Sequence, residues 1–169
     1  MPKIDLDAID CRIVAALQAD GRLSNIELAE RVGLSPSPCL RRVKRLERDG
    51  YIDAYRAVLQ RDRVGLGFSV FVGIKIEGHA SDRALDFEKA VVAMPEVVAF
   101  HMVSGEADYF VEVVVPDLEH YRRFLVTKLL ELPLVTEVRS NIAIQTLKAG
   151  APLPLGHLDP RAAGSSAKA

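Results

Sequence analysis

Apolar residues in the first part of the chain recur every three or four positions, which is the period of an amphipathic helix. A first helix is predicted from Asp7 to Ala19, where the break at Asp20-Gly21 suits a helix end. A second is predicted to start with the capping box Ser24-Asn25-Ile26-Glu27 and to run to about Val32.

A third helix is predicted directly after a tight turn at Gly33. Ser35-Pro36 offers an N-cap followed by a proline at the first helical position, and the helix is expected to run to about Asp49, with Gly50 as a C-terminal cap. Three short helices with a glycine turn between the last two predict a helix-turn-helix.

Further along, the period changes from helical spacing to strict alternation. Phe68, Val70, Val72, Ile74 and Ile76 alternate with other residues, which predicts a strand with one buried face. The remaining elements are expected as a helix from about Ser81 to Ala93, strands at Val97–Val103 and Tyr109–Val115, a helix from Asp117 to about Leu130 and a strand at Thr136–Leu147. This βαββαβ order predicts a ferredoxin-like sheet with both helices on one face, so the chain is assigned to the α+β class.

A boundary between two domains is predicted near residue 62. The extended pattern Ile52–Leu59 is followed by Arg61-Asp62-Arg63 and two glycines, which is typical of a hinge. We therefore expect a winged-helix-like DNA-binding domain with a linker strand at 1–62 and a ferredoxin-like domain at 63–150. After Lys148 the chain is rich in Ala, Gly, Pro and Ser, and 151–169 is expected to be a flexible C-terminal tail.

Composition and motif spacing exclude several classes of protein. The chain has no run of about eighteen apolar residues and no secretory leader pattern, so we expect a cytoplasmic, nucleoid-associated protein without membrane contact. Cys11 and Cys39 form no CxxC pair, and the histidines show no metal-ligand spacing. These histidines are His79, His101, His120 and His157. We expect no metal, no cofactor and no enzymatic activity.

The formal net charge of -1 hides one concentrated basic patch in the third helix. Its cations are Arg41, Arg42, Lys44, Arg45 and Arg48, and all lie within about 100° of Arg41 on a helical wheel. Leu40, Val43, Leu46 and Cys39 are assigned to the opposite, buried side. A helix that presents arginines in this way can enter a major groove. The predicted DNA contacts are Ser35, Ser37, Pro38, Arg41, Arg42, Lys44, Arg45 and Arg48.

The string Leu34-Ser35-Pro36-Ser37-Pro38-Cys39-Leu40-Arg41-Arg42-Val43 closely resembles the recognition helix of the Lrp/AsnC (leucine-responsive, feast/famine) regulators. Arg45-Leu46-Glu47, Gly50-Tyr51-Ile52 and the opening Leu6-Asp7-Ala8-Ile9-Asp10 fit the same pattern, and the likeness extends to about Leu155. It implies a regulator of transcription whose RAM/ACT-like βαββαβ domain forms homodimers. Such dimers assemble into tetramers, octamers or larger particles and bend double-stranded DNA at pseudo-palindromic operators.

The same resemblance implies an amino-acid effector. The family's Gly-x-x-Asp-Tyr/Phe motif is matched by Gly105-Glu106-Ala107-Asp108-Tyr109, where the glycine leaves backbone amides exposed and Asp108 can pair with an ammonium group. By resemblance, the facing wall comes from the last strand. The expected ligand contacts are Ser104, Gly105, Asp108, Tyr109, Thr136, Arg139, Ser140 and Ile142. From the residues alone, Asp108 could equally cap backbone amides in an ordinary turn.

Two other functions remain open on the sequence. One is an architectural DNA-binding protein whose second domain only forms oligomers and binds no effector. The other is an enzyme similar to the sirohaem decarboxylases, which share this two-part architecture and use histidines in the second domain; His101 would be the candidate here. An enzyme has no reason to keep an intact basic face on the third helix, so the regulator is the favoured interpretation.

Overall fold

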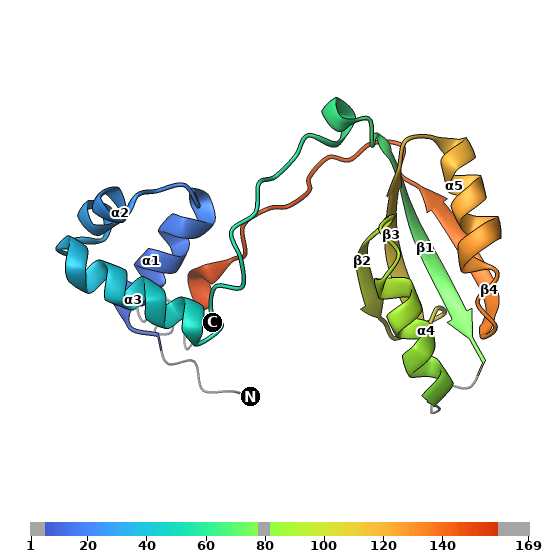
Figure 1. Ribbon diagram of the computed structural model, residues 1–169, viewed down its shortest axis with the longest axis horizontal. Coiled ribbons are helices and arrows are strands. Elements are labelled where there is room, and N and C mark those ends of the chain that lie inside the picture. The colour runs from blue at the N-terminus through green and yellow to red at the C-terminus, as the bar shows by residue number, and fades with distance from the viewer. Residues whose placement is uncertain (1–5, 78–81, 159–169) are drawn as a thin grey trace, which may run out of the picture. The chain divides into compact units, whose positions relative to one another are not determined.

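The computed structural model describes residues 6–77 and 82–158, and these divide into two compact units (Figure 1). The first unit contains the chain up to Val58 together with the residues from Lys148 onward, and the second spans Leu59–Leu147. The domain boundary expected after residue 62 falls inside a short 3-10 helix, Arg61–Val64, at the start of the second unit. His79, Ser81 and the segment 159–169 lie outside the described residues.

Three helices form the first unit, as predicted: α1 (Ala8–Ala19), α2 (Asn25–Val32) and α3 (Pro36–Arg48). The Ser24 capping box is confirmed, because Ser24 Oγ accepts from Glu27 N at 3.3 Å while Glu27 Oε2 accepts from Ser24 N at 2.8 Å. Gly33 has a φ of 74°, a left-handed conformation that favours glycine, and this ends α2 and starts the turn. Ser35 is the N-cap of α3, although its side chain makes no capping hydrogen bond.

A small core holds α3 against the other two helices. Ile13 of α1 and Cys39 and Leu46 of α3 are fully buried, and Leu28, Ala29 and Val32 of α2 complete the cluster. Leu40 does not join it, contrary to the expectation, because 42% of its surface is exposed. On the wheel Leu40 lies at the edge of the buried arc defined by Cys39, Val43 and Leu46, and the three-helix core is too small to cover that edge.

The segment between the units forms no strand with any other described segment. Residues 52–60 have an extended pattern in the sequence, yet most of their side chains are exposed. A strand needs a neighbour for its backbone N–H and C=O groups, and the described chain supplies none here. Within the first unit, the hydroxyl of Tyr55 donates to Glu47 Oε1 at 3.0 Å and so fastens the start of this segment to α3.

Part of the segment expected to be a tail lies against α1. A short 3-10 helix, Leu155–Leu158, contacts α1. The Gln18 side chain donates to Leu153 O at 2.9 Å, and the Cys11 thiol donates to Leu158 O at 3.7 Å. Residues 153–158 therefore form part of the first unit.

Truncation after Gly150 is expected to lower the stability of the first unit by about 1 kcal/mol, since it removes two hydrogen bonds and some apolar cover from α1. For a domain of this size that corresponds to a fall in Tm of about 4–8 °C. Truncation after Leu158 is the matched control and should leave the Tm unchanged. Equal Tm values for both truncations, measured by circular dichroism of the helical transition, would show that residues 151–158 contribute nothing.

The second unit has the predicted βαββαβ order. Its elements are β1 (Phe68–Ile76), α4 (Asp82–Val92), β2 (Val97–Met102), β3 (Tyr109–Val115), α5 (Leu118–Phe124) continued by a π-helical turn (Leu125–Leu129), and β4 (Val135–Ile142). The sheet is antiparallel with strand order β2-β3-β1-β4. The expected last strand was too long at its end: pairing with β1 stops at Ile142, and Ile144 and Leu147 beyond it are exposed.

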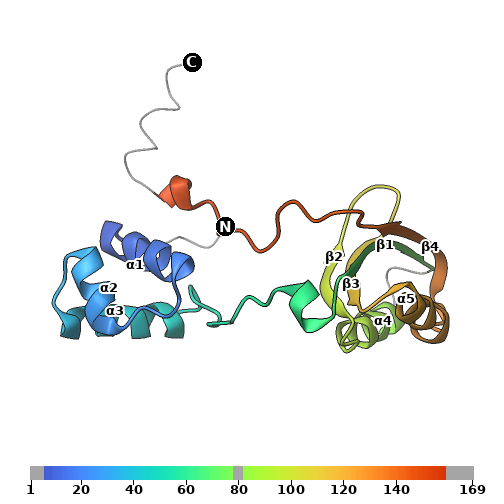
Figure 2. The ribbon, with the colours of Figure 1, turned by 90° about the horizontal axis from the view of Figure 1, so that it is seen from above.

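Both helices cover the same face of this sheet, as Figure 2 shows. Val70, Val72 and Ile74 of β1 pack with Phe87 of α4 and Phe124 of α5 in one buried cluster. On the opposite face, the described residues of the second unit form no helix or strand that covers the sheet. The described elements of the second unit therefore leave side chains on this face, such as Phe71 and Phe110, uncovered.

Candidate DNA-binding surface and ligand site

The face of α3 that points away from the core carries most of the predicted DNA contacts. Arg41, Lys44 and Arg48 are exposed, as are Ser35 and Ser37 near the helix start, while Pro38 is half-buried. Arg48 Nε pairs with Oδ1 of its neighbour Asp49, at 2.8 Å. Neither Arg41 nor Lys44 forms an ion pair with another residue in the described part of the chain. These side chains are available to an incoming polyanion.

Two other cations of the same helix are bound to carboxylates at the start of α1, the N-cap Asp7 and the helical residue Asp10. Arg42 Nη1 lies 2.6 Å from Asp7 Oδ2 and 2.8 Å from Asp10 Oδ1, and Arg45 Nη2 binds the second oxygen of Asp10. Asp10 itself is 1% exposed. Arg42 and Arg45 were predicted as DNA contacts, and the structure gives them a second role: they join α3 to α1 by a buried carboxylate.

Sequence reasoning did not identify Asp10 as part of this surface. A signal was present, because an aspartate at the third residue of α1 is expected to face the N-cap, where it accepts from Asp7 N at 3.1 Å. What the sequence could not show is that the turn brings Arg42 and Arg45 of α3 to the same carboxylate.

Asp7 is expected to make the first unit sensitive to acid. The hydrogen bond from the Asp10 backbone amide, with further help from Arg42, lowers the pKa of Asp7 to about 2 from 3.8. A group whose pKa is lowered by folding stabilises the protein above its unfolded pKa, and that stability is lost as the pH falls from about 4 to 2. Because the carboxyl is half exposed, we expect less than about 1 kcal/mol. Asp7→Asn should flatten the dependence of Tm on pH in this window, and an unchanged slope would contradict the assignment.

A hollow of about 260 Å³ lies on the open face of the sheet, beside the turn between β2 and β3. It is lined by Gly73, Lys75, Ser104, Glu106, Ala107, Phe110, Glu137, Arg139 and Asn141. Arg139 bridges Glu106 at 2.5 Å and Glu137 at 2.6 Å, and Lys75 lies 3.1 Å from Glu137. Both signs of charge therefore meet over an apolar floor formed by Phe110 and Ala107.

The predicted turn residues stand at one end of this hollow. Gly105 has a φ of 123°, which only glycine adopts readily, and a Cβ there would meet no other atom within 4 Å. Asp108 Oδ2 accepts from Ile76 N at 2.9 Å, so one oxygen of this carboxylate caps the end of β1. Capping of backbone amides, the alternative left open by the sequence, is thus part of its role.

The structure does not bring all expected ligand contacts to one site. Ser104 and Arg139 line the hollow, whereas Tyr109, Ser140 and Ile142 lie on the helix-covered face. The Tyr109 hydroxyl donates to Glu88 at 2.8 Å, and burial together with this bond raises its pKa to about 12. Ser140 hydrogen-bonds Tyr121 of α5.

The physical reason is the alternation of side chains along a strand. Arg139 and Ser140 are neighbours in β4, so they must point to opposite faces. Thr136 is occupied in another way, because it lies next to a bulge and its hydroxyl donates to Lys75 O at 3.2 Å. The period of two was visible in the sequence and could have separated these residues.

Comparison with known proteins agrees with both units. Residues 6–53 match the family described as winged helix-turn-helix DNA-binding, and residues 69–153 match the Lrp/AsnC ligand binding domain. The leucine-responsive regulatory protein of Escherichia coli (strain K12) is 44% identical over 147 residues, which cover 87% of this chain and 90% of that protein.

Solved structures give the same result. A transcriptional regulator of Neisseria meningitidis in complex with L-Met is 39% identical, with a TM-score of 0.86 over 90% of this chain and 99% of that one. An AsnC family transcriptional regulator of Agrobacterium tumefaciens is 35% identical, with a TM-score of 0.85 over the same shares. The chain belongs to the Lrp/AsnC family and is a DNA-binding regulator of transcription.

Proposed function

We propose that this regulator reads a pseudo-palindromic DNA site through Arg41, Lys44 and Arg48 and responds to an amino acid bound at the open face of its sheet. The exposed cationic face of α3, held by its back on a packed core, is the observation that supports DNA recognition. An enzyme would not need this face, so we infer a non-enzymatic role. No helix in the described residues is long and apolar enough to cross a membrane; a cytoplasmic, nucleoid-associated location is part of the proposal.

The hollow beside the β2–β3 turn is the proposed effector site. An amino acid carries an ammonium and a carboxylate group within a few ångströms, and the hollow offers Glu106 and Glu137 for the first and Lys75 and Arg139 for the second. The apolar floor at Phe110 would contact the ligand's side chain. The relative from Neisseria meningitidis was solved with L-Met, which supports an amino acid as the ligand class.

Assembly into a homodimer, and from there into tetramers, octamers or larger particles, is the second part of the proposal. The open face exposes large apolar side chains, among them Phe71 at 44% and Phe110 at 39%. Large apolar side chains exposed on one sheet face are typical of an interface. The linker segment 53–59 also has backbone groups without a backbone partner among the described residues, and these are available to a second copy.

A thermal shift screen against the twenty amino acids tests the effector. A ligand that binds only the folded state should raise Tm progressively with its concentration. Asp108→Ala and Arg139→Gln should both abolish the effect of that amino acid on DNA binding while sedimentation still shows a dimer. Flat curves at millimolar ligand, with unchanged DNA binding, would favour an architectural protein without effector; dissociation of the Asp108→Ala dimer would make that residue structural.

A further inference from the structure

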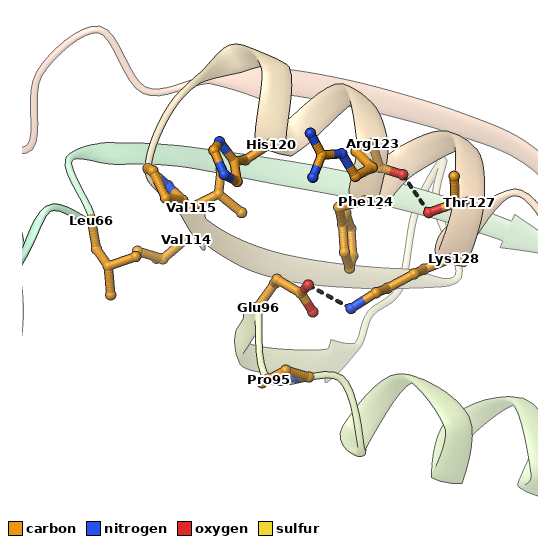
Figure 3. A pocket seen from close by; sticks show the side chains of 11 residues that line it. Leu66, Pro95, Glu96, Val114, Val115, His120, Arg123, Phe124, Thr127 and Lys128 are labelled. Carbon is orange, nitrogen blue, oxygen red and sulfur yellow. Dashed lines mark hydrogen bonds and ion pairs between the residues drawn. The ribbon is translucent and has the colours of Figure 1, made fainter.

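A second cavity, of about 360 Å³, lies at the other end of β3 and plays no part in the proposed effector site (Figure 3). One wall is formed by α5, which contributes His120 and Arg123, and by the π-helical turn after it, which contributes Lys128. The opposite wall is the chain just before β2, at Pro95 and Glu96. Since β3 separates Tyr109 from Val115 by about 20 Å, one small molecule cannot occupy both cavities.

The cavity contains an anchor for an anion. Arg123 is exposed, and its guanidinium makes no hydrogen bond or ion pair with any residue in the described ranges. His120 lies beside it in Figure 3, and its Nδ1 is engaged with Asp117 at 2.8 Å, which leaves Nε2 to face a ligand. A free guanidinium at the mouth of a cavity is suited to a carboxylate, which it can bind through two parallel hydrogen bonds.

On the other side of the cavity, one carboxylate oxygen of Glu96 lacks a hydrogen-bond donor among the described residues. Glu96 Oε1 pairs with Lys128 Nζ at 2.5 Å, but Glu96 Oε2 is buried and lacks a hydrogen-bond partner within the described residues. Buried carboxylate oxygens are nearly always satisfied, by protein, water or ligand. We therefore expect Glu96 Oε2 to accept a hydrogen bond from a ligand, and an ammonium or hydroxyl group of the ligand can donate it.

Apolar side chains lie between these two polar ends. Phe124 projects into the cavity between Arg123 and Glu96 (Figure 3), with Leu66 and Val115 also in the lining. The volume is at the small end of the range for ligand pockets. A dianion such as phosphate is disfavoured, because the Glu96 carboxylate would face it.

We propose that this cavity is a second small-molecule site that binds an apolar amino acid or hydroxy acid, with the ligand's carboxylate on Arg123 and its ammonium or hydroxyl on Glu96 Oε2. The site is independent of the hollow at the β2–β3 turn. The regulator would thus have one ligand site at each end of β3, and occupancy of the second would not depend on Asp108 or Arg139.

The test uses the full chain with Arg139→Gln, which removes the first site. Four probes with the same branched alkyl end are titrated into it by calorimetry. L-Leucine and 2-hydroxy-4-methylpentanoate carry both groups, 4-methylpentanoate lacks the donor and 3-methylbutylamine lacks the carboxylate. We expect the first two to bind with one molecule per chain. When Arg123→Gln is added to this variant, the Kd for L-leucine should rise by about tenfold or more, because a charge-assisted hydrogen-bonded pair is lost.

Arg122→Gln is the matched control, because Arg122 is the next residue of α5, pairs with Glu119 and does not line the cavity. It should bind L-leucine like its parent. Glu96→Gln should reduce the preference for L-leucine over 4-methylpentanoate. The proposal is overturned if Arg139→Gln alone abolishes all binding, if Arg122→Gln weakens it as much as Arg123→Gln, or if 3-methylbutylamine or inorganic phosphate binds as well as L-leucine. The first of these outcomes would leave the effector site at the turn intact.

Discussion

Arg41→Ala is expected to weaken DNA binding by about 1–3 kcal/mol, which is roughly 5- to 150-fold in Kd, if the side chain reads a base. Arg41 lies in the middle of the exposed face of α3 and is not held by any carboxylate in the described residues. Its guanidinium can therefore turn to a guanine edge without first breaking an ion pair. Fluorescence anisotropy on a DNA fragment selected from a random pool by the wild-type protein gives the affinity.

Arg83→Ala is the control for this measurement, because Arg83 is an exposed arginine on α4 of the other unit. It should leave Kd unchanged. A titration at several salt concentrations separates the two possible roles of Arg41: loss of a phosphate contact reduces the salt slope by about 1 and acts alike on all sequences, whereas loss of a base contact relaxes specificity. Wild-type affinity in a folded Arg41→Ala protein would show that α3 is not the reading helix.

Asp10→Ala is expected to lower the free energy of unfolding of the first unit by about 2–3 kcal/mol, because a buried carboxylate that joins two arginines is removed. Removing one partner of a fully buried ion pair would lower the free energy of unfolding by more than this. Here the side chains of Arg42 and Arg45 are 26% and 40% exposed, so water can solvate them once their partner is gone. Denaturant unfolding followed by circular dichroism measures the change.

The same variant should also weaken DNA binding at temperatures where it remains folded, since Arg42 and Arg45 lose the anchor that fixes their direction. Asp10→Asn keeps the size of the side chain and should be intermediate in stability. Asp53→Asn, at an exposed aspartate of the linker, is the control and should match wild type. If Asp10→Ala and Asp53→Asn unfold at the same denaturant concentration, the carboxylate does not hold α3 to α1.

The element order of both units could be predicted from the sequence because the signals are local. The Ser24 capping box, the glycine at position 33 and the alternation from Phe68 to Ile76 depend on residues within a few positions of each other. The ends of the helices and strands were predicted less exactly than their order. The last strand was expected to reach Leu147, but a strand ends where its partner ends, and that is decided by pairing with β1.

The candidate ligand site shows a second limit of prediction from the sequence, which concerns the face of the sheet that each side chain takes. The motif from Gly105 to Tyr109 marked the correct turn, yet a linear motif does not say which face each side chain takes. Tyr109 points to the helices, and the hollow is completed by Lys75, Glu137 and Asn141 from two other strands. These residues carry no shared spacing in the sequence, since only the sheet brings them together.

By itself, the sequence determined that this protein has a helix-turn-helix with its cations on one arc of the third helix, because a helical period and its caps are properties of adjacent residues. Only the tertiary structure decided which of those cations are free. Arg41 and Lys44 face outward, whereas Arg42 and Arg45 meet Asp10, more than thirty positions earlier in the chain. That contact depends on how three helices pack around a shared core, and packing is a property of residues that are distant in the sequence.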